Sequence, residues 1–244
     1  MLALIIGFTL LGSVGALLGA ALFLVFPEGM RRVLLPFLVS FAVGTLLASA
    51  FLCLVPAGLE KAQPLPFLAT ILGGLVAFFA LEKLILQRHS LAHDNGGHVS
   101  SGPLILIGDA FHNFVDGVVI AAAFMTSVPL GITVALAVIA HEIPQEVGEF
   151  AILLDSGFSR MKAFLLNALS ATSALPGAII AYFWLGGAEG VLPYMLAISA
   201  ASFIYVAAVD LIPSLHQDVS RWASLQQIVL LMAGIGTIAL ISVH

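Results

Sequence analysis

Two long apolar runs of this chain carry polar groups in their middles: Asp109-Ala-Phe-His-Asn-Phe-Val-Asp-Gly117 in one and His141-Glu-Ile-Pro-Gln-Glu-Val-Gly-Glu149 in the next. Each run is long enough to cross a lipid bilayer, so these acids and imidazoles are expected where charge is most expensive. Ionisable groups inside a membrane cost several kcal/mol each and usually mark a functional site. We therefore expect the function of the protein to lie between residues 109 and 149.

Composition identifies the chain as a membrane protein. Of its 244 residues, 61% are hydrophobic and only 9% are charged, which lies far outside the range of soluble domains. A helical crossing needs about 20 apolar residues. The runs do not alternate as barrel strands do, so the predicted fold is all-α, a single polytopic domain with eight transmembrane helices. These helices are expected at about 2–26, 33–57, 66–86, 103–126, 130–154, 161–185, 191–213 and 223–243.

The formal charge of −5 identifies no partner, because several acids lie inside predicted spans. We expect a lipid bilayer and no nucleic acid around the chain. Its one cysteine, Cys53, excludes an intramolecular disulfide and a cysteine-based metal cage.

Basic residues predict the orientation of the bundle. In an eight-helix arrangement Lys61 alone flanks one side, and the other seven basic residues flank the opposite side, which the positive-inside rule places in the cytoplasm. Both termini are then extracytoplasmic, as in a multi-pass protein of the cell (inner) membrane. The seven are Arg31, Arg32, Lys83, Arg88, Arg160, Lys162 and Arg221.

The two polar runs must be neighbours, because the link near Ser127-Val-Pro129 is too short for anything but an antiparallel hairpin. At 100° per residue, the polar residues of each run share one face of their helix. Equal depth in the hairpin pairs Asp116 with His141, His112 with Gln145, and Asp109 with Gly148 or Glu149. Three polar layers are therefore expected between the two helices.

Pro144 lies inside the second polar run and cannot donate to the Ala140 carbonyl one turn back. We expect a kink beside His141. Broken backbone in a membrane is tolerated where it lines a cavity or packed protein, although a simple packing kink is an alternative.

Imidazole and carboxylate with supporting amides, and no thiolate, form a ligand set for Zn²⁺, Fe²⁺ or Mn²⁺. A buried hydrogen-bonded network without metal is the alternative. Seven ionisable residues stand in this hairpin, with no lysine or arginine inside the same spans to pair them, so a cation must come from solution. They are Asp109, His112, Asp116, His141, Glu142, Glu146 and Glu149.

A second group of histidines lies in the polar segment 88–101, which we expect to be a cytoplasmic loop. His89, His93 and His98 could capture metal there, and a chance cluster in a linker is equally consistent with the sequence.

His112-Asn-Phe-Val-Asp116-Gly followed by His141-Glu-Ile-Pro-Gln-Glu146 resembles the paired signature of the ZIP family of divalent-metal transporters. The continuation Val147-Gly-Glu-Phe150 is similar to its LIV-1 branch. The resemblance implies eight helices, outward termini, frequent homodimers, and movement of zinc toward the cytoplasm, with iron, manganese or cadmium as other substrates. No prosthetic group is expected, because the metal is the substrate.

The resemblance also implies roles for the site residues. His112, Asp116, His141 and Gln145 match one metal site, and Asn113 and Glu142 match an adjoining one that Asp116 could bridge. Asp109, Glu146 and Glu149 would then form a release path or accept protons. Gln145 departs from the LIV-1 pattern, which usually has histidine there, so harder ions such as Mn²⁺ become more plausible.

Two other functions fit parts of the sequence. His141-Glu142 begins like the zinc-protease helix signature, but that signature needs a histidine where this chain has Gln145. A proton-coupled carrier of an organic substrate would use the carboxylates, yet it gives little reason for the paired histidines. A transporter rather than an enzyme is therefore expected.

Overall fold

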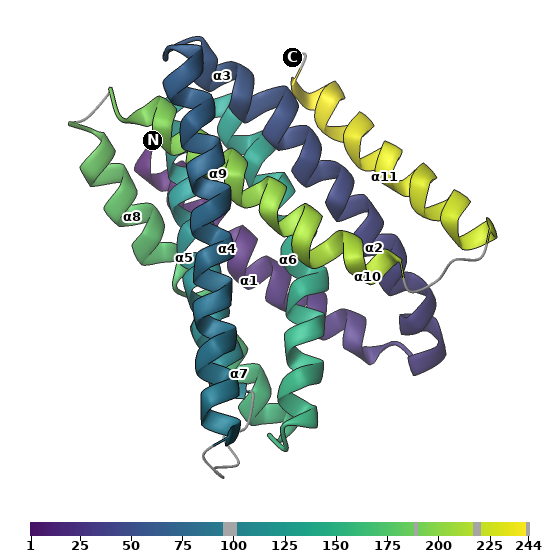
Figure 1. Cartoon of the computed structure of the whole chain (residues 1–244). Helices are drawn as coiled ribbons and strands as arrows, with labels where there is room; N and C mark the ends of the chain where they lie inside the picture. The colour runs from purple at the N-terminus through teal and green to yellow at the C-terminus, as the bar shows by residue number, and fades with distance from the viewer. Residues whose placement is uncertain (95–101, 188–189, 217–220, 243–244) are drawn as a thin grey trace.

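The protein is helical throughout the part that its structure, a computed structural model, describes: residues 1–94, 102–187, 190–216 and 221–242. These residues contain no β-strand. Figure 1 shows the arrangement of the helices, and π-helical turns are labelled η below. The elements are α1 (Leu2–Val25), α2 (Glu28–Ala48), η1 (Ser49–Leu54), α3 (Val55–Leu59), α4 (Pro64–Asp94), α5 (Gly102–Thr126), α6 (Val128–Asp155), α7 (Arg160–Ala171), α8 (Ala174–Leu185), α9 (Leu192–Tyr205), η2 (Val206–Leu211), α10 (Ile212–Leu215) and α11 (Arg221–Ser242).

The prediction of eight membrane-spanning helices is confirmed within these described residues. Eight helical segments are long and apolar enough to cross a membrane. The side of the membrane on which the termini lie stays a prediction. The segments are Leu2–Val25, Glu28–Leu59, Pro64–Leu84, Leu106–Thr126, Val128–Leu154, Arg160–Leu185, Leu192–Leu215 and Trp222–Ser242.

Three of these segments depart from a regular α-helix just before a proline. The π-helical turns η1 and η2 end two residues before Pro56 and Pro213, and α7 and α8 are separated at Thr172 and Ser173, shortly before Pro176. Proline has no N–H to donate to the carbonyl four residues earlier, so the turn in front of it widens or breaks. The spans at 161–185 and 191–213 were expected without a break.

One expected boundary was wrong. The helix α4 continues to Asp94, so the first half of the polar segment 88–101 has a helical backbone instead of the predicted loop conformation. Residues 95–101 lie outside the described residues.

The hairpin of α5 and α6 lies at the centre of the bundle. It packs against α1 and α8 on one side, while α2 with α11 and α4 with α9 form close pairs around the other (Figure 1). Glycines permit the closest approaches: a Cβ on Gly117 would lie 1.9 Å from the Ala174 carbonyl oxygen, and one on Gly44 would lie 2.1 Å from that of Leu231. These helices therefore touch backbone to backbone.

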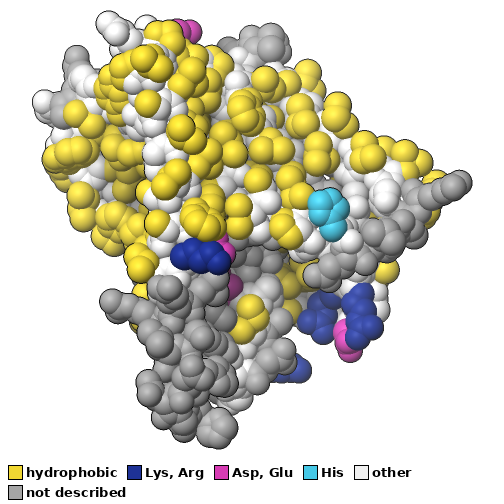
Figure 2. Space-filling view, in the orientation of Figure 1, with side chains coloured by type: hydrophobic (Ala, Val, Ile, Leu, Met, Phe, Trp, Pro, Cys, Tyr) yellow, Lys and Arg dark blue, Asp and Glu magenta, His cyan; other side chains and the backbone are white. Residues whose placement is uncertain are grey.

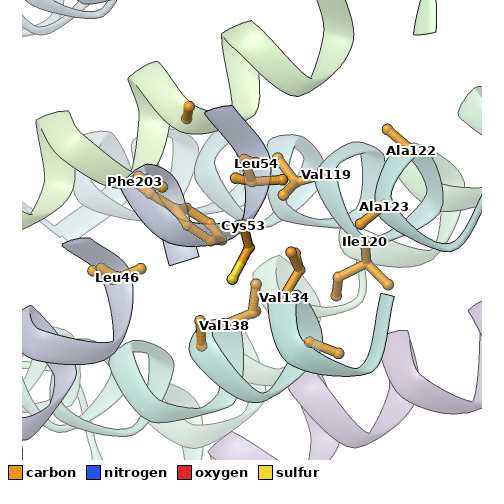
Figure 3. Close-up of a cluster of buried hydrophobic side chains, with 14 of the residues drawn as sticks. Leu46, Cys53, Leu54, Val119, Ile120, Ala122, Ala123, Val134, Val138 and Phe203 are labelled. Carbon is orange, nitrogen blue, oxygen red and sulfur yellow. The ribbon is translucent and has the colours of Figure 1, made fainter. Parts of the chain in front are cut away.

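The apolar core fills one half of this bundle. Figure 3 shows side chains from α2, η1, α5, α6 and α9 meeting there, among them Leu46, Leu54, Ile120, Val134 and Phe203. They lie toward the hairpin turn, beyond Asp116 and His141. These side chains are almost fully buried, so apolar atoms fill this half of the hairpin closely.

One face of the outer surface is apolar over most of its height. Figure 2 shows hydrophobic side chains across this face, with the Lys and Arg side chains gathered below them. Arg31, Arg160 and Lys162 stand near the helix ends of α2 and α7 at this end of the bundle. We call it the basic end.

Candidate metal centre

Four side chains of the hairpin converge on one point. His112 and Asp116 stand one turn apart on α5, and His141 and Glu142 are consecutive on α6. The turn that joins the two helices brings these side chains together. The Ser127 hydroxyl accepts a hydrogen bond from the Leu130 amide and caps α6, so that Ser127 is the single residue between α5 and α6. One ligand atom from each residue lies within 4.8 Å of all the others. We call these four residues the metal centre.

The distances inside the metal centre are short. Nε2 of His141 lies 3.2 Å from Nε2 of His112, 3.2 Å from Oδ2 of Asp116 and 3.4 Å from Oε1 of Glu142. Nε2 of His112 lies 3.5 Å from Oε1 of Glu142 and 3.9 Å from Oδ2 of Asp116. The expected pairing of Asp116 with His141 at equal depth is therefore found.

The imidazole of His141 is fixed from two sides. Its Nδ1 lies 3.1 Å from the Ala137 carbonyl oxygen, and because that oxygen can only accept, Nδ1 carries the proton. Its Nε2 lone pair then faces the other ligands, the arrangement that backbone partners impose on metal-binding histidines. The ring also meets Phe203 of α9 edge to face, with centroids 6.0 Å apart.

Both carboxylates of the metal centre lack donors. The four oxygens of Asp116 and Glu142 are buried and accept no hydrogen bond. In the described part of the chain, the ion pair that arginine or lysine makes is Arg32 with Glu28 on the surface, so no basic side chain neutralises these acids. Unpaired buried carboxylates are costly, and a bound cation would remove the cost.

The geometry of the metal centre suits a tetrahedral dication. Ligand atoms at Zn–N and Zn–O distances of about 2.0–2.1 Å are about 3.4 Å apart in a tetrahedron. The five distances that involve the two Nε2 atoms run from 3.2 to 3.9 Å. Two imidazoles and two carboxylates also balance the charge of a divalent ion, so the residues fit zinc without rearrangement of their helices.

Asp109 lies one turn below the metal centre and is held by Asn113. The Asn113 amide nitrogen donates to the backbone oxygen of Asp109 at 3.2 Å and to its Oδ1 at 2.8 Å, and the Ser170 hydroxyl of α7 donates to Oδ2. Asn113 was expected beside Glu142 in an adjoining site. Its amide nitrogen instead holds Asp109, while Glu142 lies with the imidazoles.

Gln145 and Glu149 face a cavity of about 260 Å³ between α4, α5, α6 and α9. The Gln145 amide nitrogen donates to Glu149 Oε1 at 3.1 Å. Asp109, His112 and Glu82 line the same cavity, and none of the described residues that line it is lysine or arginine. We call it the acidic cavity. It reaches the metal centre through His112, whose side chain is 18% exposed.

Glu146 faces away from the acidic cavity. It lines a larger cavity of about 620 Å³ between α1, α2, α6 and α7, together with Asn167. The Asn167 amide nitrogen donates to the Glu146 backbone oxygen at 3.4 Å, and both Glu146 carboxylate oxygens are buried without a donor. Arg31 and Arg160 line this cavity too, and we call it the arginine cavity. The three acids expected to share one path thus divide between two cavities.

Several neighbours of the site were not predicted from the sequence. Ser170 binds Asp109, Phe203 supports His141, and the Tyr205 hydroxyl of α9 donates to Glu82 of α4. Nothing in their local sequence separates them from ordinary packing residues, because their partners lie 60 or more positions away. The histidine cluster is described only in part: His98 lies outside the described residues, and of His89 and His93 only the backbone is described, within α4.

Known proteins have sequences similar to that of this chain. The family described as ZIP Zinc transporter matches residues 92–242. Zinc transporter ZIP13 of Pongo abelii is 37% identical over 174 residues, which cover 70% of this chain and 52% of that protein. Zinc transporter ZIP6 of Homo sapiens is 40% identical over 166 residues, covering 64% of this chain and 22% of that protein. The chain spans about half the length of the ZIP13 relatives it matches. By the family match and the metal centre that lies within it, the chain belongs to the ZIP zinc transporter family.

Proposed function

We propose that this protein carries divalent transition-metal ions across a membrane, zinc first among them, through the metal centre between α5 and α6. One observation carries the proposal. Two imidazoles and two carboxylates surround a point at tetrahedral spacing inside the membrane-spanning bundle, and the carboxylates have no donor or basic partner. The two relatives named above are zinc transporters by name, which supports the same substrate.

The cavities support a direction of movement. The apolar core covers the metal centre toward the hairpin turn, whereas the acidic cavity opens from His112 toward the basic end. Under the positive-inside rule the basic end is cytoplasmic. An ion at the metal centre in this conformation would exchange with the cytoplasmic side, and Asp109 and Glu149 would receive it as it leaves. We propose net movement toward the cytoplasm, with both termini outside the cell membrane, as the family resemblance implies.

The substrate range follows from the ligands. Gln145 offers a neutral amide in the position where a histidine would strengthen zinc binding, and its nitrogen is already used by Glu149. Its oxygen is a hard, weak ligand, so we propose that Fe²⁺, Mn²⁺ and Cd²⁺ compete with Zn²⁺. Asn113 acts on the cation only indirectly, because its amide nitrogen holds Asp109. Glu146 lies in the arginine cavity, away from the metal centre.

Protease activity is not favoured. A zinc protease needs two imidazoles of one helix facing the metal, and here the second imidazole comes from α5. A carrier of an organic substrate would not need four ligands within 4.8 Å. Homodimer formation remains a proposal that rests on the family resemblance, and metal capture by His89, His93 and His98 remains one that rests on their closeness in the sequence.

Metal uptake into liposomes tests the function. The purified protein is reconstituted around a zinc-sensitive dye, and initial rates are compared for wild type, Asp116→Ala and His141→Ala. Loss of one of four ligands removes roughly a quarter of a binding free energy of about 10–16 kcal/mol for a four-ligand zinc site. Each variant should therefore lose most of its flux at micromolar zinc.

Glu60→Gln is the control, because Glu60 is an exposed acid outside the spans. It should transport like wild type. Full flux through Asp116→Ala or His141→Ala would show that the metal centre is not on the transport path.

A further inference from the structure

The arginine cavity has no part in the transport path proposed above. It lies where α1 ends, α2 begins, α6 ends and α7 begins, so it is at the basic end of the bundle. Its inner end is formed by Glu146 and Asn167, each 1% exposed, and the exposed Arg160 stands nearer its mouth. With about 620 Å³ it can hold far more than an ion.

The charges of this cavity favour an anion. Two guanidinium groups, those of Arg31 and Arg160, face one carboxylate, that of Glu146. The Nε of Arg31 is buried and has no acceptor. The neighbouring Arg32, by contrast, is 79% exposed and paired with Glu28 at 2.5 Å. The Nε–H group of Arg31, a partly buried residue, is thus a buried donor without an acceptor, and a buried polar group of this kind calls for a partner.

The remaining walls of the cavity are apolar. Leu17, Leu24, Phe150, Leu154 and Phe164 line it. At its edge the apolar surface continues outward over Val25 (78% exposed) and Met161 (67% exposed), which also line it. These side chains belong to membrane-spanning segments or their ends, so the cavity adjoins the acyl chains of the bilayer.

We propose that the arginine cavity binds an anionic phospholipid, with its phosphate on Arg31 and Arg160 and an acyl chain along the apolar wall. Basic pockets between helix ends at the membrane surface recognise such head groups, and Arg pairs with phosphate through two parallel hydrogen bonds. A free phosphate would leave the apolar wall uncovered, and a metal ion would meet two like charges.

Lipid binding can be measured without any metal, so its outcome is independent of the proposed transport. The detergent-purified chain is offered phosphatidylglycerol or phosphatidylcholine with identical acyl chains, and retained lipid is counted by native mass spectrometry. Wild type should prefer the anionic lipid. Each arginine near the surface contributes about a fivefold preference, so Arg31→Gln with Arg160→Gln should lose about thirtyfold.

Arg32→Gln is the matched control, because it removes the same charge one residue away from Arg31 but outside the cavity. It should keep the preference of wild type. Equal retention of both lipids by wild type would overturn the proposal, and so would equal losses in Arg32→Gln and in the double variant. Inorganic phosphate supplies a further arm: if it raises the melting temperature as much as phosphatidylglycerol does, the ligand is a free anion and the proposal is wrong.

Discussion

Replacement of Gly117 by alanine tests whether the packing of α5 on α8 positions the metal centre. A Cβ at Gly117 would lie 1.9 Å from the Ala174 carbonyl oxygen, whereas ordinary contacts begin at 3.4 Å. The two backbones must therefore separate by about 1.5 Å, and overpacking of this kind costs about 1–3 kcal/mol. Neither neighbour can yield by rotating a side chain, because the contact is with backbone.

The effect should reach the metal through Asp116, the residue before Gly117. Metal sites tolerate errors of about 0.2 Å in ligand distance, so even a third of the 1.5 Å separation, passed along α5, would spoil the tetrahedral spacing. We expect zinc affinity to fall at least about tenfold, which is about 1.4 kcal/mol. Isothermal titration calorimetry in nanodiscs measures this affinity, and a thermal melt of the same sample measures the loss of stability.

Two further variants make the test specific. Gly177→Ala adds a methyl group to the same interface from α8, where its Cβ would lie 2.2 Å from the Phe114 carbonyl oxygen. It should therefore behave like Gly117→Ala. Gly148→Ala is the control, because no atom lies within 4 Å of its Cβ and alanine favours helix by up to about 1 kcal/mol. If Gly117→Ala bound zinc and melted like Gly148→Ala, the reasoning from backbone contact would be refuted.

Three other predictions concern the ligands and their support. Lowering the pH should weaken zinc binding, because only neutral imidazole is a ligand and protons compete with the ion for His112 and His141; binding in nanodiscs that does not change with pH would contradict the two-histidine centre. Gln145→His should raise zinc affinity relative to Mn²⁺, because nitrogen replaces a hard oxygen, and competition uptake with both ions would detect an unchanged ratio as the contrary result. Phe203→Leu should alter the visible spectrum of bound Co²⁺ by releasing the His141 ring, whereas Phe203→Tyr should preserve it; identical spectra for both would show that the ring contact has no orienting role.

Much of the fold follows from composition and length alone. Eight apolar runs, each about 20 residues long, must become helices, because a lipid-buried backbone has to satisfy its own hydrogen bonds. The short link at Ser127 forces α5 and α6 into a hairpin, and helical periodicity then brings Asp116 to His141. Local physics is enough for these features, since each depends on residues that are close in sequence or joined by a tight turn.

The irregularities of the helices were harder to predict from the sequence. Pro56 and Pro213 were visible in the sequence, but only the structure shows that the chain widens into a π-turn before them, because the neighbouring helices decide whether a turn widens or breaks. The segment 88–101 was expected to be a loop from its polar composition, and α4 nevertheless continues through its first half.

The sequence by itself determined the membrane class, the eight spans and the hairpin that carries two histidines and two acids. Only the tertiary structure decided that Glu142 joins the imidazoles, that Glu149 and Glu146 face different cavities, and that Ser170, Phe203 and Tyr205 support the site from other helices. The reason is physical: residues on one helix share a face by periodicity, whereas the neighbour of that face depends on how distant helices pack, and packing depends on contacts such as that of Gly117 with Ala174.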